Sequence, residues 1–203
     1  MIVERVADLA LSDLGAPRLD TGATHGVSAA SGETPDQTER ITVEPPTART
    51  AWGGLPFLLH LVPGAPSRAV LQLAGLDLLS RLDPDVDPDD PALSAFVGHS
   101  PFSVGSTPFE ALDPTPGERR AAQTLAVELL AGLLQRVRVE PPLTPDEVLE
   151  LVCRRDAVIE ADPGWIDVVL SIDSVVVEVR AAGLDLDLGY VPWLGCVVRF
   201  RYV

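Results

Sequence analysis

The chain has 203 residues, of which 46% are hydrophobic, and this length suits one domain with a tail or two small domains. Its 30 acidic and 15 basic residues give a formal net charge of −15, and such an acidic surface repels phosphate backbones and anionic lipids. Binding to nucleic acid or to a membrane surface is therefore not expected, and no apolar run approaches the roughly 20 residues needed to span a bilayer.

The first 14 residues predict a short amphipathic helix. Ile2, Val6, Leu9 and Ala10 share one face of a helix over residues 2–14. A helix of about 13 residues is marginally stable alone in water. We therefore expect it to dock, either on its own domain or on a partner protein.

Acidic residues also lie within this first segment. Glu4 and Asp8 interrupt its apolar residues, and no cationic leader precedes them, so a signal peptide is not expected. The expected location is the cytoplasm. Cys153 and Cys196 both lie in apolar stretches, which is typical of buried reduced thiols, although a disulfide between them is possible.

Residues 15–48 are rich in Gly, Ser, Thr, Pro and Asp and contain few large apolar side chains. Such a segment cannot bury enough surface to offset the entropy of ordering, so it predicts a flexible linker, with one brief extended piece at 41–43. The composition changes abruptly at residue 49. We expect residues 49–203 to form a single α+β domain.

The beginning of this domain predicts three helices. Pro56 suits the first turn of a helix in the apolar segment 49–63, and a second helix is expected over 66–82. The acidic run 83–90 lacks the glycine and the distal glutamate of a calcium-binding loop and is interpreted as a solvated turn. Its last aspartate caps a short helix expected to end at Val97. A loop over 98–114 follows.

Two further helices begin with the same Thr-Pro-x-Glu sequence, at Thr115 and at Thr144. In this capping box the threonine hydroxyl accepts from a backbone N–H of the first turn, and the glutamate reaches back to the threonine N–H. Proline stands where a missing N–H costs nothing. The predicted helices run to about Arg136 and to about Arg154.

The last part of the chain has β character. Residues 158–160, 165–172 and 196–203 predict strands, because apolar and polar residues alternate along the last two. We expect them to pair as antiparallel strands. Residues 173–182 fit a strand by their valines and a helix by a cap and a glycine stop, and we favour the helix. The predicted class is α+β, with helices in the N-terminal and middle part and a small antiparallel sheet formed by the C-terminal segment.

No catalytic, metal or cofactor motif is present in the sequence. His25, His60 and His99 have neither the spacing of zinc ligands nor a nucleophile motif beside them. We therefore expect no catalytic residues, no metal, no cofactor and no enzymatic activity. The alternative is a small hydrolase, in which the fold would bring His60 or His99 into a cleft beside a serine, an aspartate or Cys153.

Aromatic side chains are the candidate interaction residues. Tryptophan is common both in protein cores and in interface hot spots, so each of the three tryptophans of the chain can serve either role. The candidates are Trp52, Trp165, Trp193 and Tyr190.

Two regions resemble proteins encoded with contractile injection systems, which are phage-tail-like machines. The segments that carry the resemblance are Trp52-Gly53-Gly54-Leu55-Pro56-Phe57-Leu58-Leu59 with Asp89-Asp90-Pro91-Ala92-Leu93, and then Asp162-Pro163-Gly164-Trp165-Ile166, Gly183-Leu184-Asp185-Leu186-Asp187, Val191-Pro192-Trp193-Leu194-Gly195 and Val197-Val198-Arg199-Phe200. The segments 52–59 and 89–93 are similar to a group called tape-measure proteins.

This resemblance implies an assembly, accessory or tape-measure-related role, with tail, tube or baseplate subunits as partners. A molecular ruler needs length, and a helix supplies about 1.5 Å per residue. With 19 prolines and no long uninterrupted helix, this chain cannot span a tail as a rod. The resemblance therefore implies an accessory role rather than measurement. A generic adaptor, reaching its partner through the helix at 2–14 and the linker, is the remaining alternative.

Overall fold

A computed structural model describes residues 47–100 and 113–203, which lie within one compact unit, Thr42–Val203. The predicted helix at 2–14, the extended piece at 41–43 and the linker up to residue 46 lie outside the described residues. The helical elements are η1 (Leu55–Leu61), α1 (Arg68–Ser80), α2 (Pro91–Phe96), α3 (Pro116–Arg136), α4 (Pro145–Cys153), η3 (Ile172–Ser174) and α5 (Val177–Ala181). The strands are β1 (Thr47–Thr50), β2 (Ala157–Asp162), β3 (Trp165–Leu170), β4 (Gly189–Val191) and β5 (Cys196–Tyr202).

The fold is of the α+β class, as predicted. Both capping boxes are formed: the Thr115 hydroxyl accepts from the backbone N–H of Glu118, and the Thr144 hydroxyl accepts from that of Glu147. Each glutamate accepts in turn from the backbone N–H of its threonine, at 2.9 Å and 2.7 Å. These reciprocal bonds satisfy backbone groups that a helix start otherwise leaves unpaired.

Two helical elements differ in detail from the prediction. The helix that contains Pro56 is a 3-10 helix rather than an α-helix. The segment 173–182 is helical, as favoured, but α5 begins only at Val177, and its cap residue Val176 makes no side-chain capping bond. Ser171, rather than Asp173, caps the short η3 turn. Gly183 ends this region with a φ of 67°, the left-handed conformation that a glycine stop requires.

The sheet has five strands in the order β1-β2-β3-β5-β4 and is mixed. The prediction of a purely antiparallel sheet is wrong, because β3 and β5 pair in parallel. The connection over 171–195 contains α5 and β4, and it is long enough to return the chain to the starting end of β3. Strand β1 begins at Thr47, so the last two residues of the expected linker belong to the sheet edge.

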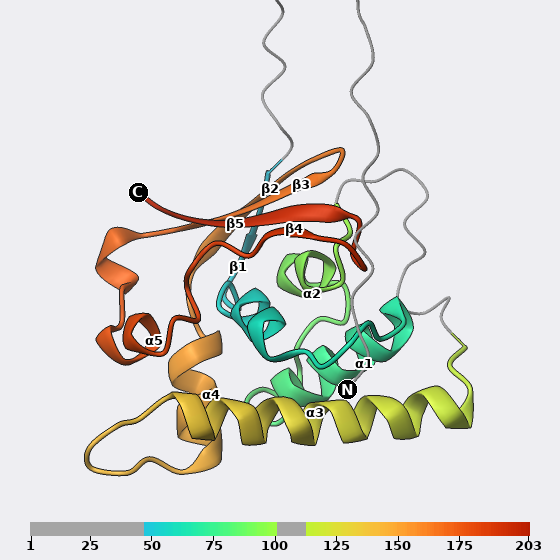
Figure 1. Cartoon of the computed structure of the whole chain (residues 1–203), viewed down its shortest axis with the longest axis horizontal. Helices are drawn as coiled ribbons and strands as arrows, with labels where there is room; N and C mark the ends of the chain where they lie inside the picture. Colours follow the sequence, from blue (N-terminus) through green and yellow to red (C-terminus); the bar gives the residue numbers. More distant parts are fainter. Residues whose placement is uncertain (1–46, 101–112) are drawn as a thin grey trace, which may run out of the picture. The chain divides into compact units, whose positions relative to one another are not determined.

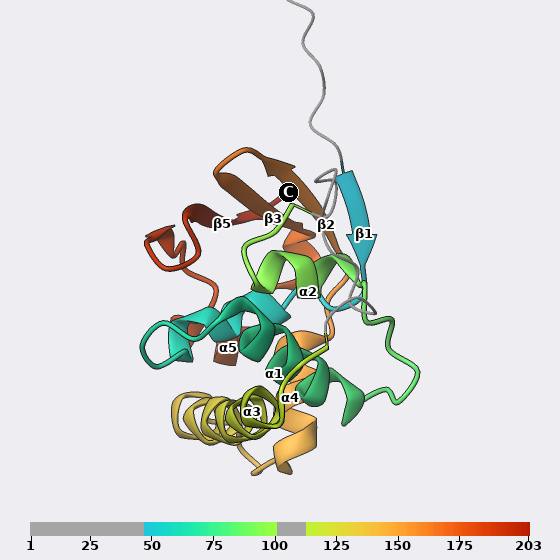
Figure 2. The ribbon, with the colours of Figure 1, turned by 90° about the vertical axis from the view of Figure 1, so that its right-hand side faces the viewer.

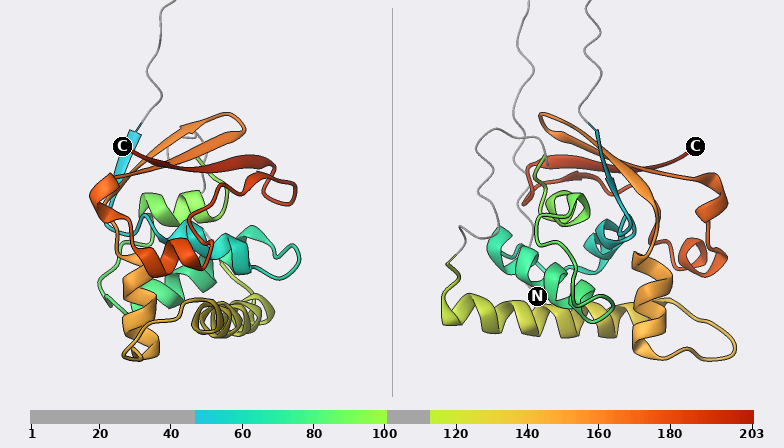
Figure 3. Two further views of the ribbon diagram at one scale, coloured as in Figure 1. Left: turned by 60° about the vertical axis from the view of Figure 1, so that its left-hand side comes forward. Right: turned by 180° about the vertical axis from the view of Figure 1, so that it is seen from behind.

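The helices lie on one side of the sheet, as Figures 1 and 3 show. Helix α2 and η1 are next to the strands, α1 lies beyond them, and the long α3 forms the layer farthest from the sheet (Figures 1 and 2). No described helix covers the other side of the sheet. We call that side the outer face.

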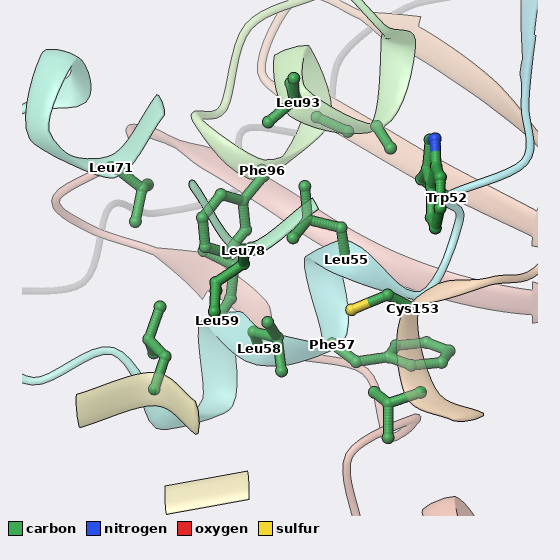
Figure 4. Packing of buried hydrophobic residues seen from close by; sticks show 14 of the residues in the cluster. Trp52, Leu55, Phe57, Leu58, Leu59, Leu71, Leu78, Leu93, Phe96 and Cys153 are labelled. Carbon is green, nitrogen blue, oxygen red and sulfur yellow. The ribbon is translucent and has the colours of Figure 1, made fainter. Parts of the chain in front are cut away.

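The core lies between the sheet and these helices. Figure 4 shows the side chains of η1 packed against Leu78 of α1 and Phe96 of α2. Leu55, Phe57 and Leu58 are completely buried, and the Phe57 ring meets that of Phe200 edge-on at 4.7 Å. The apolar segment 49–63 therefore forms the centre of the domain.

Two glycines allow this segment to approach the end of α4. The N–H of Gly53 donates to the Arg155 carbonyl at 2.9 Å, and that of Gly54 donates to the Cys153 carbonyl at 3.2 Å. A Cβ atom on Gly54 would lie 1.8 Å from the Val152 carbonyl oxygen, and one on Gly53 would lie 2.2 Å from another side chain. Only glycine fits at these two positions.

Candidate functional site: the outer face of the sheet

The outer face consists of the strand residues that alternate with the core residues, and the strand register arranges them in rows. One row contains an aspartate and two aromatic residues, the next contains two acidic residues beside an arginine, and the third contains two valines between arginines. In strand order these rows are Asp162–Trp165–Val197–Tyr190, Thr47–Glu160–Asp167–Arg199 and Arg49–Val158–Val169–Arg201.

The two carboxylates of the charged row form ion pairs with Arg199 of the same row and with Arg201 of the next row. Both carboxylate oxygens of Asp167 accept from the Arg199 guanidinium at 2.6 Å, and Arg201 lies 3.3 Å from Glu160 and 3.7 Å from Asp167. The aspartate side chain is 10% exposed, whereas the two arginine side chains are 41% and 50% exposed. The guanidinium groups are thus the outermost charges, and the carboxylates lie beneath them. The paired carboxylate raises the pKa of Arg199 further.

The aromatic row brings together two of the predicted interaction residues. Trp165 on β3 and Tyr190 on β4 both stand beside Val197 of β5 in the register, and they are 45% and 63% exposed. The Arg199 guanidinium lies over the Trp165 ring, 4.5 Å from its centroid. The ring is therefore held in place while much of it stays accessible to solvent.

The row with two valines borders a shallow depression of about 670 Å³ where β1 and β3 end and β2 begins, and the exposed Asp156 also lines it. Val158 and Val169 are half-buried and form its floor, and Val203, which is 67% exposed, forms part of its rim. Arg49 lines the end at β1 and makes no ion pair with any described residue. No sequence pattern indicates this depression, because its parts come from segments more than 100 residues apart that only the strand register brings together.

The other two predicted interaction residues do not belong to the outer face. Trp52 is 5% exposed in the core, with the Arg154 guanidinium 4.9 Å from its ring centroid. Trp193 is half-buried in the turn between β4 and β5 and packs against the core. The proline and glycine around Trp193 suit this turn, so its sequence context describes a packing role as well as it describes an interface.

The histidines predicted as candidates for a hydrolase lie in different surroundings. His60 bonds the Leu186 carbonyl at 2.8 Å. His99 lies in a small pocket with Ser100 and Asp162, but its Nε2 accepts from the Arg68 guanidinium at 2.7 Å. Burial and the adjacent charge of Arg68 lower the pKa of His99, which favours the neutral form of the ring.

The two cysteines are free and buried. Burial raises the pKa of the Cys153 thiol to about 12, which keeps it protonated and unreactive at neutral pH. Cys153 lies in α4 and is completely buried, so it forms part of the core.

A buried polar cluster lies at the end of β5 on the helix side. The Tyr202 hydroxyl donates to Asp185 at 3.0 Å, and Arg180 pairs with the same carboxylate oxygen at 2.9 Å. The Asp185 side chain is 1% exposed, and its other oxygen has no hydrogen-bond partner among the described residues. Asp187 satisfies a backbone group of β5 that β4 does not reach. Its side chain accepts from the Phe200 N–H at 2.7 Å, beyond the residues that pair with the short β4.

Within residues 47–100 and 113–203, no group of three or more His, Cys, Asp or Glu side chains could hold a metal ion. No helix in this part of the chain is long and apolar enough to cross a bilayer.

No protein-family model matches the chain, and neither a curated protein nor a solved structure is similar to it.

Proposed function

We propose that this chain is a non-enzymatic protein-interaction component that binds a partner protein through the outer face of its sheet. The observation that carries the proposal is the row in which Trp165 and Tyr190 stand exposed on either side of Val197, with Arg199 against the tryptophan ring. Tryptophan, tyrosine and arginine are the residue types that most often dominate binding energy in protein interfaces.

Preorganisation of these side chains also supports the proposal. Arg199 is fixed by two bonds to Asp167, and its guanidinium in turn restrains the Trp165 ring. Side chains that are already ordered lose less entropy when a partner binds. Arg199 and Arg201 are paired with Asp167 and Glu160, so a partner that covers these four side chains leaves none of them as an isolated buried charge.

The resemblance in the sequence suggests the class of partner. We propose tail, tube or baseplate subunits of a contractile injection system, with this chain acting in assembly or as an accessory component. Several residues of the segments that carry the resemblance pack within the fold: Gly53 and Gly54 allow the close approach to α4, and Trp193 packs in the turn before β5. Trp165 and Arg199 of the same segments lie on the outer face. They are consistent with a shared domain fold rather than a shared reactive site.

A binding experiment tests both parts of the proposal. The immobilised full chain is incubated at physiological salt with purified tail, tube and baseplate subunits of a contractile injection system. We expect at least one subunit to be retained, and W165A and Y190A each to weaken its binding by about tenfold or more. V127A, which truncates a side chain 68% exposed on α3, is the matched control and should not change binding.

Two results would contradict the proposal. If no subunit is retained, the partner class is wrong. If a subunit is retained equally by W165A, Y190A and V127A, binding occurs elsewhere and the outer face is not the interface. Circular dichroism of each variant verifies that the fold is unchanged.

The hydrolase alternative has weaker support. His99 shares its pocket with a serine and an aspartate, but Arg68 occupies Nε2 and the pKa of His99 is lowered. A general base works best when its pKa is near the working pH. The interaction role therefore remains our proposal for this chain.

A further inference from the structure

The outer face has a second depression, which lies beside the aromatic row and bears on the kind of side chain that a partner presents there. Its volume is about 280 Å³, and its lining consists of the exposed Trp165, three carboxylates and one guanidinium. The charged residues are Glu160, Asp162, Asp167 and Arg199. We call this depression the Trp165 pocket. With three negative charges against one positive charge, its lining has a surplus of two negative charges.

Ion pairs account for all of these charges except one. Arg199 bonds both carboxylate oxygens of Asp167 at 2.6 Å, and Arg201, which does not line the pocket, pairs with Glu160 at 3.3 Å. Asp162 is exposed, and none of the ion pairs of the described residues includes it. The pocket therefore keeps one unpaired carboxylate even when both arginines are counted against its charge.

Arg68 also lies in the neighbourhood of Asp162, since both residues line an adjacent pocket. The Arg68 guanidinium is used elsewhere: it donates to the His99 ring at 2.7 Å and to the Leu194 carbonyl at 2.9 Å. Within the described parts of the chain, it forms no ion pair with Asp162. The Asp162 carboxylate is thus left to a cation from outside the domain.

The strand register places this carboxylate next to the indole ring. Asp162 ends β2 and Trp165 begins β3, and the two residues pair directly in the antiparallel register. Side chains at such positions have Cβ atoms about 5 Å apart. A cation that lies against the exposed part of the Trp165 ring is therefore within reach of Asp162.

We propose that the Trp165 pocket binds an arginine side chain of the partner protein, whose guanidinium lies against the indole ring and bonds the Asp162 carboxylate. This inference rests on the proposed function, since it assigns the chemistry that the same face recognises. Tryptophan is the aromatic residue that attracts cations most strongly. The planar guanidinium of arginine both stacks on aromatic rings and forms paired hydrogen bonds with a carboxylate.

Charge beyond the pocket favours the same partner. The pKa of Arg199 is raised, chiefly by its bond to Asp167 and also by the charge of Asp187, so carboxylates dominate the potential around this guanidinium. The chain as a whole carries a net charge of −15, which speeds the encounter with a basic partner and slows that with an acidic one. The local charge of the pocket and the net charge of the chain therefore select the same sign.

The probe is the capped peptide Gly-Ser-Arg-Ser-Gly, added to the ¹⁵N-labelled full chain and followed by NMR chemical shifts. We expect saturable shifts that include the indole N–H of Trp165 and the backbone N–H groups of the turn between β2 and β3. The matched peptide has citrulline, a neutral isostere, in place of arginine. It should bind at least about fivefold more weakly, because it lacks the charge.

Protein variants provide the second arm. D162N keeps the shape of the side chain and removes its charge, and it should weaken binding of the arginine peptide by about fivefold or more. D77N makes the same change at an exposed aspartate of α1 and should leave binding unchanged. Neither substitution breaks a described ion pair, so both variants should fold, which their own spectra verify. A tail, tube or baseplate subunit that the native chain retains should be retained less by D162N than by D77N.

Several outcomes would overturn the inference. These are the absence of saturable shifts at Trp165, equal binding of the arginine and citrulline peptides, equal binding of the arginine peptide by D162N and D77N, or equal retention of a subunit by the two variants. If a subunit still binds through Trp165 and Tyr190 in these cases, the proposed function stands and only the assignment of arginine is wrong. If the peptide behaves as expected and no such subunit binds, the recognition of arginine stands and the class of partner is wrong.

Discussion

The Arg199 guanidinium lies over the Trp165 ring at 4.5 Å from its centroid, across the parallel pairing of β5 with β3. The same guanidinium bonds both carboxylate oxygens of Asp167 at 2.6 Å. One arginine thus links the charged row of the outer face to its aromatic row.

R199A should lower the free energy of unfolding by about 1.5 kcal/mol, since it removes both charged hydrogen bonds and the contact with the ring. Urea denaturation measures the difference. R138A changes an exposed arginine that has no described ion pair, and should shift the midpoint by far less. Equal effects of the two substitutions would show that the network contributes nothing to stability.

G54A should destabilise the domain by more than about 3 kcal/mol or prevent folding, because its Cβ would lie 1.8 Å from the Val152 carbonyl oxygen. Thermal unfolding gives the comparison. In G132A, within α3, the nearest atom to the added Cβ is a methyl carbon of Leu61 at 3.7 Å, and the better helix propensity of alanine should stabilise the domain slightly. A mild effect of G54A would mean that the segment 49–63 does not approach α4 as described.

T144A should lower the free energy of unfolding by about 1 kcal/mol, because the first turn of α4 loses its side-chain cap. The control variant is T124A. The Thr124 hydroxyl only donates to the Arg120 carbonyl within α3, so its loss should be nearly neutral. Chemical denaturation of both variants measures the loss in the free energy of unfolding. Equal losses for T144A and T124A would show that Thr144 does not cap α4.

The Glu147 carboxylate predicts a pH dependence at the same helix start. The backbone N–H of Thr144 and then its hydroxyl hold the pKa of Glu147 below the usual value of 4.5. A lowered pKa in the folded state stabilises the protein above the unfolded value, and this contribution is lost as the pH falls through the folded value. The difference in thermal midpoint between the native chain and E147Q should therefore shrink as the pH is lowered below about 4.5. If the difference in thermal midpoint stays constant with pH, ionisation of Glu147 does not contribute to stability.

Y202F should lower stability by about 1.5 kcal/mol at pH 7, because the buried Asp185 loses a hydrogen-bond donor. Burial, followed by the bond to Asp185, raises the pKa of Tyr202 from 10.0 to about 12. The stability due to a raised pKa is complete below the unfolded value and is lost as the pH rises through the folded value. The difference in the free energy of unfolding between the native chain and Y202F, measured by urea denaturation, should thus become smaller from pH 10 to pH 12. The control variant Y190F, at an exposed position, should leave stability unchanged.

Local features of the sequence were sufficient to predict several elements. The Thr-Pro-x-Glu starts at Thr115 and Thr144 specify α3 and α4, because a capping box uses only neighbouring residues. Alternation also separates the core side of β5 from Arg199 and Arg201 on the outer side, since side chains alternate along any strand.

The pairing of those strands depends on the tertiary structure. The parallel contact of β3 with β5 follows from the path of the chain over 171–195, which no alternation pattern encodes. The candidate site has the same dependence: Arg49 and Val158 become neighbours only through the pairing of β1 with β2. The sequence by itself thus determined the type and sidedness of most elements through contacts within a few residues. Only long-range packing decided the mixed sheet, the burial of Trp52 and the rows of the outer face, because these depend on which distant segments bury their apolar sides together.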